Sequence, residues 1–164
     1  MKHNCYISIG SNLGDRLLNI DFSISKLSCF AEVVKSSSYY ETSSWGYHDT
    51  RDYINVVVQV RTLLTPLLLL NKLKLIESKM GRKVNKQSHY SARVIDLDIL
   101  FFDDLVLSKN DLIVPHPQLY NRKFVLVPLS EISPKFKCPV RNLTIENLLF
   151  QVKDDSRMSL FKKS

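Results

Sequence analysis

The sequence predicts one domain of the α/β class, with β-strands and α-helices alternating along the chain. Three observations predict it. Segments 6–9, 53–61 and 93–102 have the apolar or alternating pattern of strands. Leucine and isoleucine recur at helical spacing within 15–28 and 65–80. The length of 164 residues is about that of one domain with a sizeable core, and no linker divides residues 1–164.

Composition indicates a globular protein of the cytoplasm. The longest apolar run, LLTPLLLL, is interrupted by Pro66 and is much shorter than the ~20 residues that cross a bilayer. The first residues enter a strand-like pattern directly, so we expect neither a signal peptide nor a membrane partner. Cys5, Cys29 and Cys138 are odd in number, widely spaced and without a metal-binding pattern, which is typical of reduced thiols.

The basic charge balance favours anionic partners. The net charge is +7 and the isoelectric point is near 9.3, which suits nucleotide phosphates or nucleic acid. Basic and aromatic residues are not interleaved as in RNA-binding sheets, so we expect no nucleic acid, and a nucleic-acid-binding domain stays an alternative. Residues 153–164 contribute to the excess and are expected to form a loosely ordered basic tail.

The first part of the chain predicts a strand, a turn, a helix and a second strand. The strand over 6–9 leads into GSNLGDR at 10–16, a composition typical of a strand-to-helix turn and not of a P-loop. A helix over 15–28 and a strand over 33–40 follow. The polar segment 41–50 holds the only tryptophan, Trp45, and is interpreted as a long, mobile surface loop of the kind that often carries function.

A polar residue interrupts the β-branched strand 53–61. Tyr53 and Asn55 share one face of this strand, because side chains alternate between faces. The amide of Asn55 offers both donors and an acceptor, which suits the edge of a heterocycle. A hydrogen-bonded sheet asparagine without a ligand is the alternative.

A helix and a basic segment follow. Thr65 and Pro66 are typical of a helix start, and Gly81 of its end. Residues 82–93 then carry several cations without any apolar periodicity, which favours a loop that closes over bound phosphates rather than an ordinary solvated loop. These cations are Arg82, Lys83, Lys86, Arg93 and, if protonated, His89.

The strand over 93–102, RVIDLDILFF, organises the rest. Alternation places Asp96, Asp98, Leu100 and Phe102 on one face, opposite Ile95, Leu97, Ile99 and Phe101. Two carboxylates on one face of an apolar strand need a cation, because like charges this close resist joint ionisation. Oxygen ligands suit Mg²⁺, which commonly accompanies phosphates. A structural acid pair held by arginine or lysine is the alternative.

The remaining segments place a histidine and an arginine near this strand. A turn at 103–105 and a short return strand at 106–107 precede His116, which two prolines hold in place. A helix over 121–132 brings Arg122 and Phe124 near His116, and a last helix covers 144–150. A fixed histidine and arginine beside a metal site suit a phosphate.

Taken together, these motifs resemble the 6-hydroxymethyl-7,8-dihydropterin pyrophosphokinase family of folate biosynthesis. The resemblance covers most of residues 6–134. It rests on GSNLGDR at 10–16, SxxYET at 37–42, DYIN at 52–55, IExxxGR at 76–82, RxIDLDILFF at 93–102 and VPHPQLYNRKFVLVPLSEISP at 114–134.

The resemblance implies a ferredoxin-like fold with a mostly antiparallel sheet and helices on both faces. It implies an enzyme, an ATP-dependent diphosphokinase that transfers pyrophosphate from ATP to the pterin hydroxymethyl group and releases AMP. It also implies two Mg²⁺ ions as cofactors, ATP as co-substrate, small-molecule partners only, and a monomer.

The resemblance assigns roles to individual residues. Asp96 and Asp98 match the metal ligands, and Arg82 and Arg93 match cations that act on the transferred group. The nucleotide positions are Lys74, Glu77, Arg82, Arg93, Ile99, His116 and Arg122. The pterin positions are Thr42, Trp45, Tyr53, Asn55, Asp96 and Phe124.

Departures from the family pattern fall in the basic segment. The family commonly reads WGPRTxDLDI before the acids, where this chain reads YSARVIDLDI, and Val84 stands where a basic residue is frequent. A nucleotidyltransferase on a similar fold, which also uses paired aspartates on a strand, remains the competing enzyme class.

Overall fold

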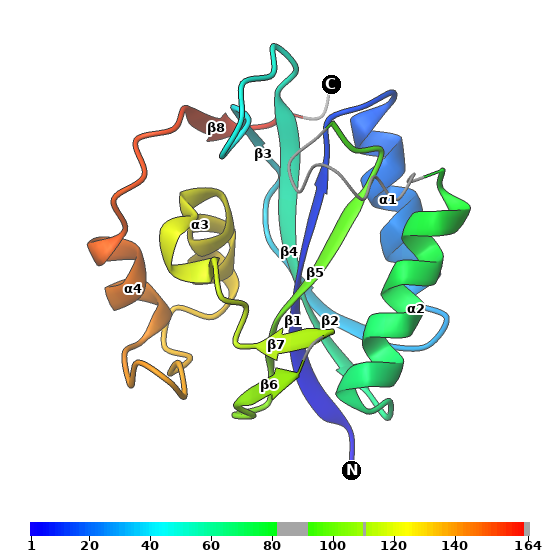
Figure 1. Cartoon of the computed structure of the whole chain (residues 1–164), viewed down its shortest axis with the longest axis vertical. Helices are drawn as coiled ribbons and strands as arrows, with labels where there is room; N and C mark the ends of the chain where they lie inside the picture. The colour runs from blue at the N-terminus through cyan, green and yellow to red at the C-terminus, as the bar shows by residue number, and fades with distance from the viewer. Residues whose placement is uncertain (82–91, 110, 163–164) are drawn as a thin grey trace.

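The structure is a computed structural model that describes residues 1–81, 92–109 and 111–162. It confirms a mixed α/β fold (Figure 1). The elements are β1 (His3–Ser11), α1 (Arg16–Leu27), β2 (Glu32–Ser36), β3 (Tyr40–Thr42), β4 (Tyr53–Thr62), α2 (Pro66–Lys79), β5 (Asp96–Phe102), β6 (Leu107–Lys109), β7 (Leu112–Val114), the 3₁₀ turn η1 (Leu119–Asn121), α3 (Lys123–Ile132), α4 (Ile145–Gln151) and β8 (Met158–Leu160).

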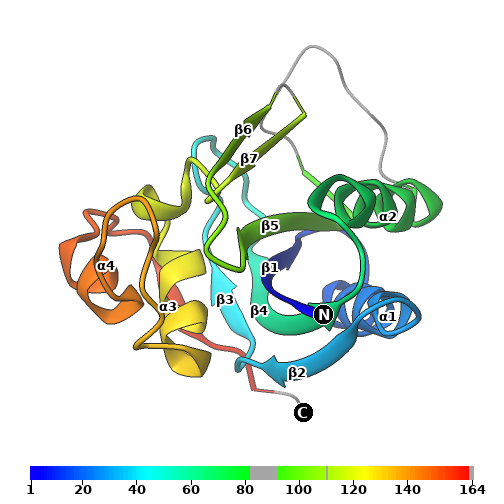
Figure 2. The same cartoon turned by 90° about the horizontal axis from the view of Figure 1, so that it is seen from below.

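The main sheet is antiparallel at each of its described pairings. β1 lies between β4 and β5, and β3 and β8 continue the sheet beyond β4. β2 also pairs with β4, further along that strand than β3 does. Helices α1 and α2 cover one face and α3 and α4 the other (Figure 2). The expected antiparallel sheet with helices on both faces is therefore confirmed.

Each face of the sheet has its own apolar core. Between the sheet and α1 and α2, the buried side chains include Ile7, Ile20 and Leu73. Between the sheet and α3 and α4, they include Phe101 and Leu126. Burial on both faces explains why the middle of β4, from Ile54 to Val58, is almost entirely apolar.

A β-bulge corrects the expected alternation in β5. Tyr6 of β1 pairs with Phe101, but the next residue, Ile7, pairs with Ile99, so Leu100 is an extra residue. Leu100 and Phe101 consequently both pack on the α3 side, whereas Phe102 packs on the α1–α2 side with Ile99. The prediction for Phe101 and Phe102 was wrong, because alternation holds only where each residue has one partner.

Helix boundaries largely follow the predicted signals. Asp15 caps α1, its side chain accepting a hydrogen bond from the backbone N–H of Leu18 at 2.9 Å. Thr65 precedes α2 as predicted, but its side chain makes no capping hydrogen bond. Gly81 follows α2 with φ +88°, a conformation that disfavours other residues.

Three further expectations are corrected. The strand expected over 33–40 is two strands, β2 and β3, that pair with different parts of β4. The return strand expected at 106–107 begins only at Leu107, as β6, which pairs with β7 and not with β5. The tail expected to be loosely ordered contains β8, because β3 offers an unpaired edge and Phe161 packs against the core.

None of the helices in the described part of the chain combines the length and apolarity needed to cross a membrane.

The core against α3 makes a direct stability prediction. Leu126→Ala should lower the free energy of unfolding by about 2–5 kcal/mol, because Leu126 is fully buried and its truncation leaves a cavity. The matched control Leu18→Ala, at a leucine that is 62% exposed, should change it by no more than about 0.5 kcal/mol. Urea denaturation measures both, and equal losses would contradict the assignment of this core.

Candidate active site

One cavity of about 330 Å³ opens on the α3 face of the sheet. β1, β3, β4 and β5 contribute to its wall, together with the loop 43–52 and the start of α3. Ten residues predicted from the sequence line it together: Thr42, Trp45, Tyr53, Asn55, Arg93, Asp96, Asp98, His116, Arg122 and Phe124. Residues from distant parts of the chain thus meet at one place.

The acid pair lies on one face of β5, as the alternation predicts. Arg93 donates to Asp96 Oδ2 at 2.7 Å. Asp98 Oδ2 lies 3.9 Å from an Arg122 guanidinium nitrogen and 3.8 Å from His116 Nε2. Asp96 therefore has a close arginine partner, whereas the contacts of Asp98 are ion-pair contacts longer than hydrogen bonds.

The environment shifts the pKa of two of these groups in ways that matter near pH 7. Burial, followed by repulsion from Asp96, raises the pKa of Asp98 to about 7, although Arg122 opposes the shift. The Asp98 side chain is still 35% exposed towards the open cavity, so water moderates this effect. Burial, followed by Arg122, lowers the pKa of His116 to about 4, so its imidazole is neutral at pH 7.

The donor chemistry of the acid pair fits Mg²⁺. Magnesium usually takes one or two carboxylates and completes its shell with water and substrate phosphates. Asp96 and Asp98 supply two carboxylates beside a cavity that could hold phosphates. Among the described residues, no three histidine, cysteine, aspartate or glutamate side chains are grouped so that they could hold a metal ion. The two carboxylates therefore suit an ion that takes its remaining ligands from water and substrate phosphates.

A second part of the cavity presents an amide. Asn55 is buried and donates from Nδ2 to Thr42 Oγ1 at 2.7 Å. Gly10 in β1 is the register partner of Asn55 on one side and of Asp96 on the other. A Cβ at Gly10 would lie 2.7 Å from Asn55 Oδ1, which is too close, so a larger residue here would force the Asn55 side chain to move.

Aromatic side chains form the outer wall. Phe124, at the start of α3, contacts Trp45 edge-on with ring centroids 6.4 Å apart. The Arg122 guanidinium lies 4.9 Å from the Trp45 ring centroid and 5.6 Å from that of Phe124. Tyr53 lies on the wall formed by β4, where burial and a hydrogen bond with Tyr47 raise its pKa. Aromatic and charged groups thus share this cavity.

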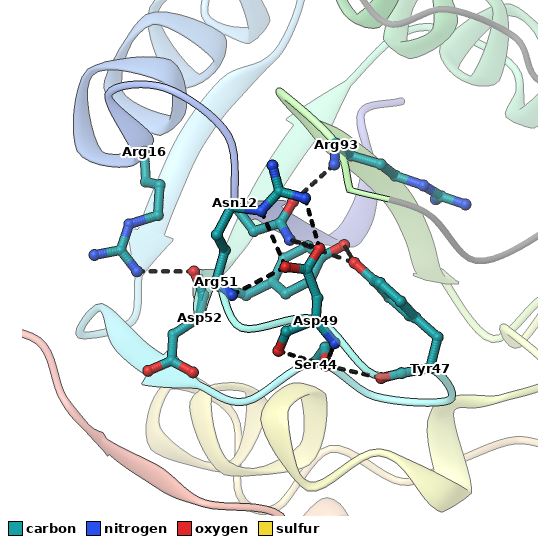
Figure 3. A network of polar contacts seen from close by, with 9 residues as sticks. Asn12, Arg16, Ser44, Tyr47, Asp49, Arg51, Asp52 and Arg93 are labelled. Carbon is teal, nitrogen blue, oxygen red and sulfur yellow. Dashed lines mark hydrogen bonds and ion pairs between the residues drawn. The ribbon is translucent and has the colours of Figure 1, made fainter.

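The loop 43–52 is fastened to the turn after β1 (Figure 3). Asn12 Nδ2 donates to Tyr47 Oη at 3.3 Å and to Asp49 Oδ2 at 3.5 Å. Asn12 also accepts from the Arg93 backbone N–H at 2.7 Å and donates its own N–H to the Arg93 carbonyl at 3.1 Å. These bonds connect the loop, through Asn12, to Arg93 in the segment before β5, and the expected mobility of the loop stays a prediction.

Three predicted residues in the described part of the chain are not among those that line the cavity. Lys74 is exposed on α2. Glu77 is buried and accepts from the Leu97 backbone N–H at 2.7 Å, and the Ile99 side chain is buried in the core, which leaves only its backbone for a ligand. Arg82 lies outside the described residues. The roles of these residues stay predictions.

Sequence reasoning missed several lining residues. GSNLGDR was interpreted as a turn, but Gly10 and Ser11 belong to β1, and Gly10 lines the cavity. Extending the alternation of the first strand beyond residue 9 would have put Ser8 and Gly10 on the face of Tyr6. No sequence signal identified Tyr47, because its place depends on how the loop folds against Asn12.

Comparison with known proteins identifies the family. The family model for 7,8-dihydro-6-hydroxymethylpterin-pyrophosphokinase (HPPK) matches residues 6–134. The chain belongs to this family. It is 38% identical over 149 residues to the 2-amino-4-hydroxy-6-hydroxymethyldihydropteridine pyrophosphokinase of Aquifex aeolicus, covering 88% of this chain and 92% of the relative. The Bacillus subtilis enzyme of the same name is 40% identical over 134 residues, covering 80% and 79%.

Solved structures support the fold. The structure of wild-type HPPK-DHPS from Plasmodium falciparum superimposes with a TM-score of 0.75 over 92% of this chain, at 17% identity. This chain spans 45% of that longer protein. HPPK membership therefore makes the chain a pyrophosphokinase of folate biosynthesis, and the expectation of an enzyme is confirmed.

The raised pKa of Asp98 predicts a pH-dependent stability difference. In the unfolded chain the carboxyl titrates near its ordinary value of about 3.9, so the folded state binds more protons between that value and about 7. Wild-type stability should therefore fall, relative to Asp98→Asn, as the pH rises from 4 to 8. Urea denaturation of both proteins in EDTA measures this difference, and a difference independent of pH would contradict the raised pKa.

Proposed function

We propose that this HPPK transfers pyrophosphate from ATP to the hydroxymethyl group of 6-hydroxymethyl-7,8-dihydropterin and releases AMP in a Mg²⁺-dependent reaction. One observation carries the proposal. An amide-and-aromatic half suited to a heterocycle and an acid-and-cation half suited to a metal–triphosphate open into one cavity. The names of the relatives supply the substrate class.

The pterin would occupy the half that Tyr53, Asn55 and Phe124 line. Stacking between aromatic rings contributes about 1 kcal/mol beyond the buried area, and Tyr53 and Phe124 offer two such rings. The Asn55–Thr42 pair offers donors and acceptors to the edge of the heterocycle. Trp45 would close this half from the loop.

The triphosphate would occupy the half that contains the acid pair. Asp96 and Asp98 would hold the magnesium, which when bound neutralises phosphate charge and favours the transfer. Arg93 and Arg122 contribute positive charge beside the pair, and Arg82 is proposed to add another from the basic segment. Neutral His116, whose Nδ1 accepts from the Gln118 backbone N–H, can donate from Nε2 to a phosphate oxygen without a charge of its own.

The reaction forms one bond and breaks one bond at the β-phosphorus. The pterin hydroxyl oxygen bonds to the β-phosphorus, and the bond from that phosphorus to the oxygen that bridges it to the α-phosphorus breaks. AMP leaves with the bridging oxygen, and the hydroxyl proton passes to solvent. Catalysis of this kind depends mostly on positioning and electrostatic stabilisation. The residues around the cavity supply both.

The product identifies the reaction. Purified protein with ATP, Mg²⁺ and 6-hydroxymethyl-7,8-dihydropterin should produce AMP and a diphosphorylated pterin in equal amounts, measured by chromatography. Asp98→Ala should reduce turnover by at least about 10²–10³-fold, because a metal-binding carboxylate is lost. Its circular dichroism spectrum should remain that of the wild type, since Asp98 is not a core residue.

Other products would refute the proposal. Release of pyrophosphate with a nucleotide attached to the acceptor would indicate a nucleotidyltransferase. Unchanged turnover of Asp98→Ala would remove Asp98 from the magnesium site. Nucleic-acid binding that weakens steeply with salt and needs no Mg²⁺ would favour the remaining alternative.

A substitution at Gly10 tests the pterin half of the cavity without removing a core side chain. Gly10→Ala should displace the Asn55 side chain and weaken pterin binding about tenfold, because one buried hydrogen-bonding group is misplaced. Titration calorimetry with the pterin measures this loss. Gly14→Ala, where a Cβ would meet only the Asn19 amide at 4.0 Å, is a control for strain outside the cavity and should leave pterin affinity unchanged. Equal losses would contradict the role of Gly10.

A further inference from the structure

The C-terminal segment 152–161, here called the C-terminal strap, crosses from α4 to the edge of the sheet beside β3 (Figure 1). It lies beyond residues 6–134, which carry the family match. Its backbone and side chains contact three separate parts of the chain that line the cavity. The strap therefore contacts the backbone segments that carry several of the cavity's side chains.

The first contact is at the start of α3. Asp154 Oδ2 accepts a hydrogen bond from the Lys123 backbone N–H at 2.9 Å. Arg122 precedes this turn and provides no side-chain cap, so Asp154 supplies the capping carboxylate from another part of the chain. The negative charge also suits the positive end of the helix. Arg122 and Phe124, on either side of the capped residue, both line the cavity.

The second contact is at the end of β3. Met158 of β8 is the register partner of Thr42, the residue that accepts the hydrogen bond of Asn55. The next residue, Ser43, donates its backbone N–H to the Arg157 carbonyl at 3.1 Å. The strap thereby holds the backbone of Thr42 and of Ser43, the first residue of the loop 43–52.

The third contact is at the start of β4. The Arg157 guanidinium forms an ion pair with Asp52, the residue before Tyr53. The Asp52 carbonyl in turn accepts from an Arg16 guanidinium nitrogen at 2.8 Å (Figure 3). Asp52, the residue before Tyr53 in the chain, is therefore held by Arg16 of α1 and by Arg157 of the strap.

We propose that Asp154 and Arg157 are positioning residues through which the C-terminal strap sets the geometry of the pterin half of the cavity. The proposal rests on the proposed function, which places the pterin between Tyr53 and Phe124. Neither residue lines the cavity. Asp154 acts through the start of α3, and Arg157 acts through Asp52 and Ser43.

The two residues have different kinetic signatures. Arg157→Glu places two like charges together and should raise KM for the pterin about fivefold, while KM for ATP stays unchanged. Asp154→Ala should raise KM for the pterin by a similar factor and raise KM for ATP as well, because Arg122 precedes the capped turn. Steady-state AMP formation measures both constants.

Conservative and matched variants distinguish positioning from general loss of structure. Asp154→Asn keeps an oxygen acceptor and Arg157→Lys keeps a positive charge, so both should restore most of the pterin affinity. Lys153→Glu makes the same charge change as Arg157→Glu at an exposed residue without a described ion pair, and should behave as wild type. Thermal unfolding of every variant sets an assay temperature at which all are folded.

The outcomes separate this inference from the proposed function. Failure of the wild type to form AMP would refute the proposed function, and calorimetric pterin affinities of the same variants would still test the strap. Active wild type with unchanged pterin KM in Arg157→Glu and Asp154→Ala would overturn the strap's role. Equal effects of Lys153→Glu and Arg157→Glu would overturn it too, because they would indicate a general charge effect.

Discussion

The site depends on the electrostatic conflict between two aspartates that point from one face of β5. Burial, followed by repulsion from Asp96, raises the pKa of Asp98 to about 7. Arg93, Arg122 and His116 come from different segments of the chain, and all three contact the pair. A protein that only needed stability would be better served by apolar residues here. The conflict is understandable if a bound cation and phosphates resolve it.

Strand β1 determines how the two halves of the cavity are spaced. Gly10 lies between Asn55 on β4 and Asp96 on β5, so the amide and the acid pair are two strand spacings, or about 10 Å, apart. Because Gly10 has no side chain, the space above it stays open to ligands from either half. The bulge at Leu100 matters for the same region, since the Leu100 carbonyl accepts from the His116 backbone N–H at 3.0 Å. A change of strand register would therefore disturb both halves.

The wall of the cavity is assembled from parts that have little stability of their own. The loop 43–52 is held by the side chain of Asn12, which also bonds to the backbone of Arg93. The strap holds the two ends of the same loop, at Ser43 and Asp52. Such loops keep a defined shape through side-chain hydrogen bonds rather than through a buried core. The cavity geometry is consequently a property of the whole chain and not of the central strand alone.

The sequence by itself determined the fold class, the acid pair and most of the residues around the cavity. Alternation and helical spacing are local properties, so they placed Asp96, Asp98 and Asn55 on the right faces of their strands. Only the tertiary structure decided that Leu100 is a bulge, that Tyr47 meets Asn12, and that residues 158–160 form a strand. Each of these depends on a partner far away in the chain, and a single sequence without pairing information contains no local signal for such partners.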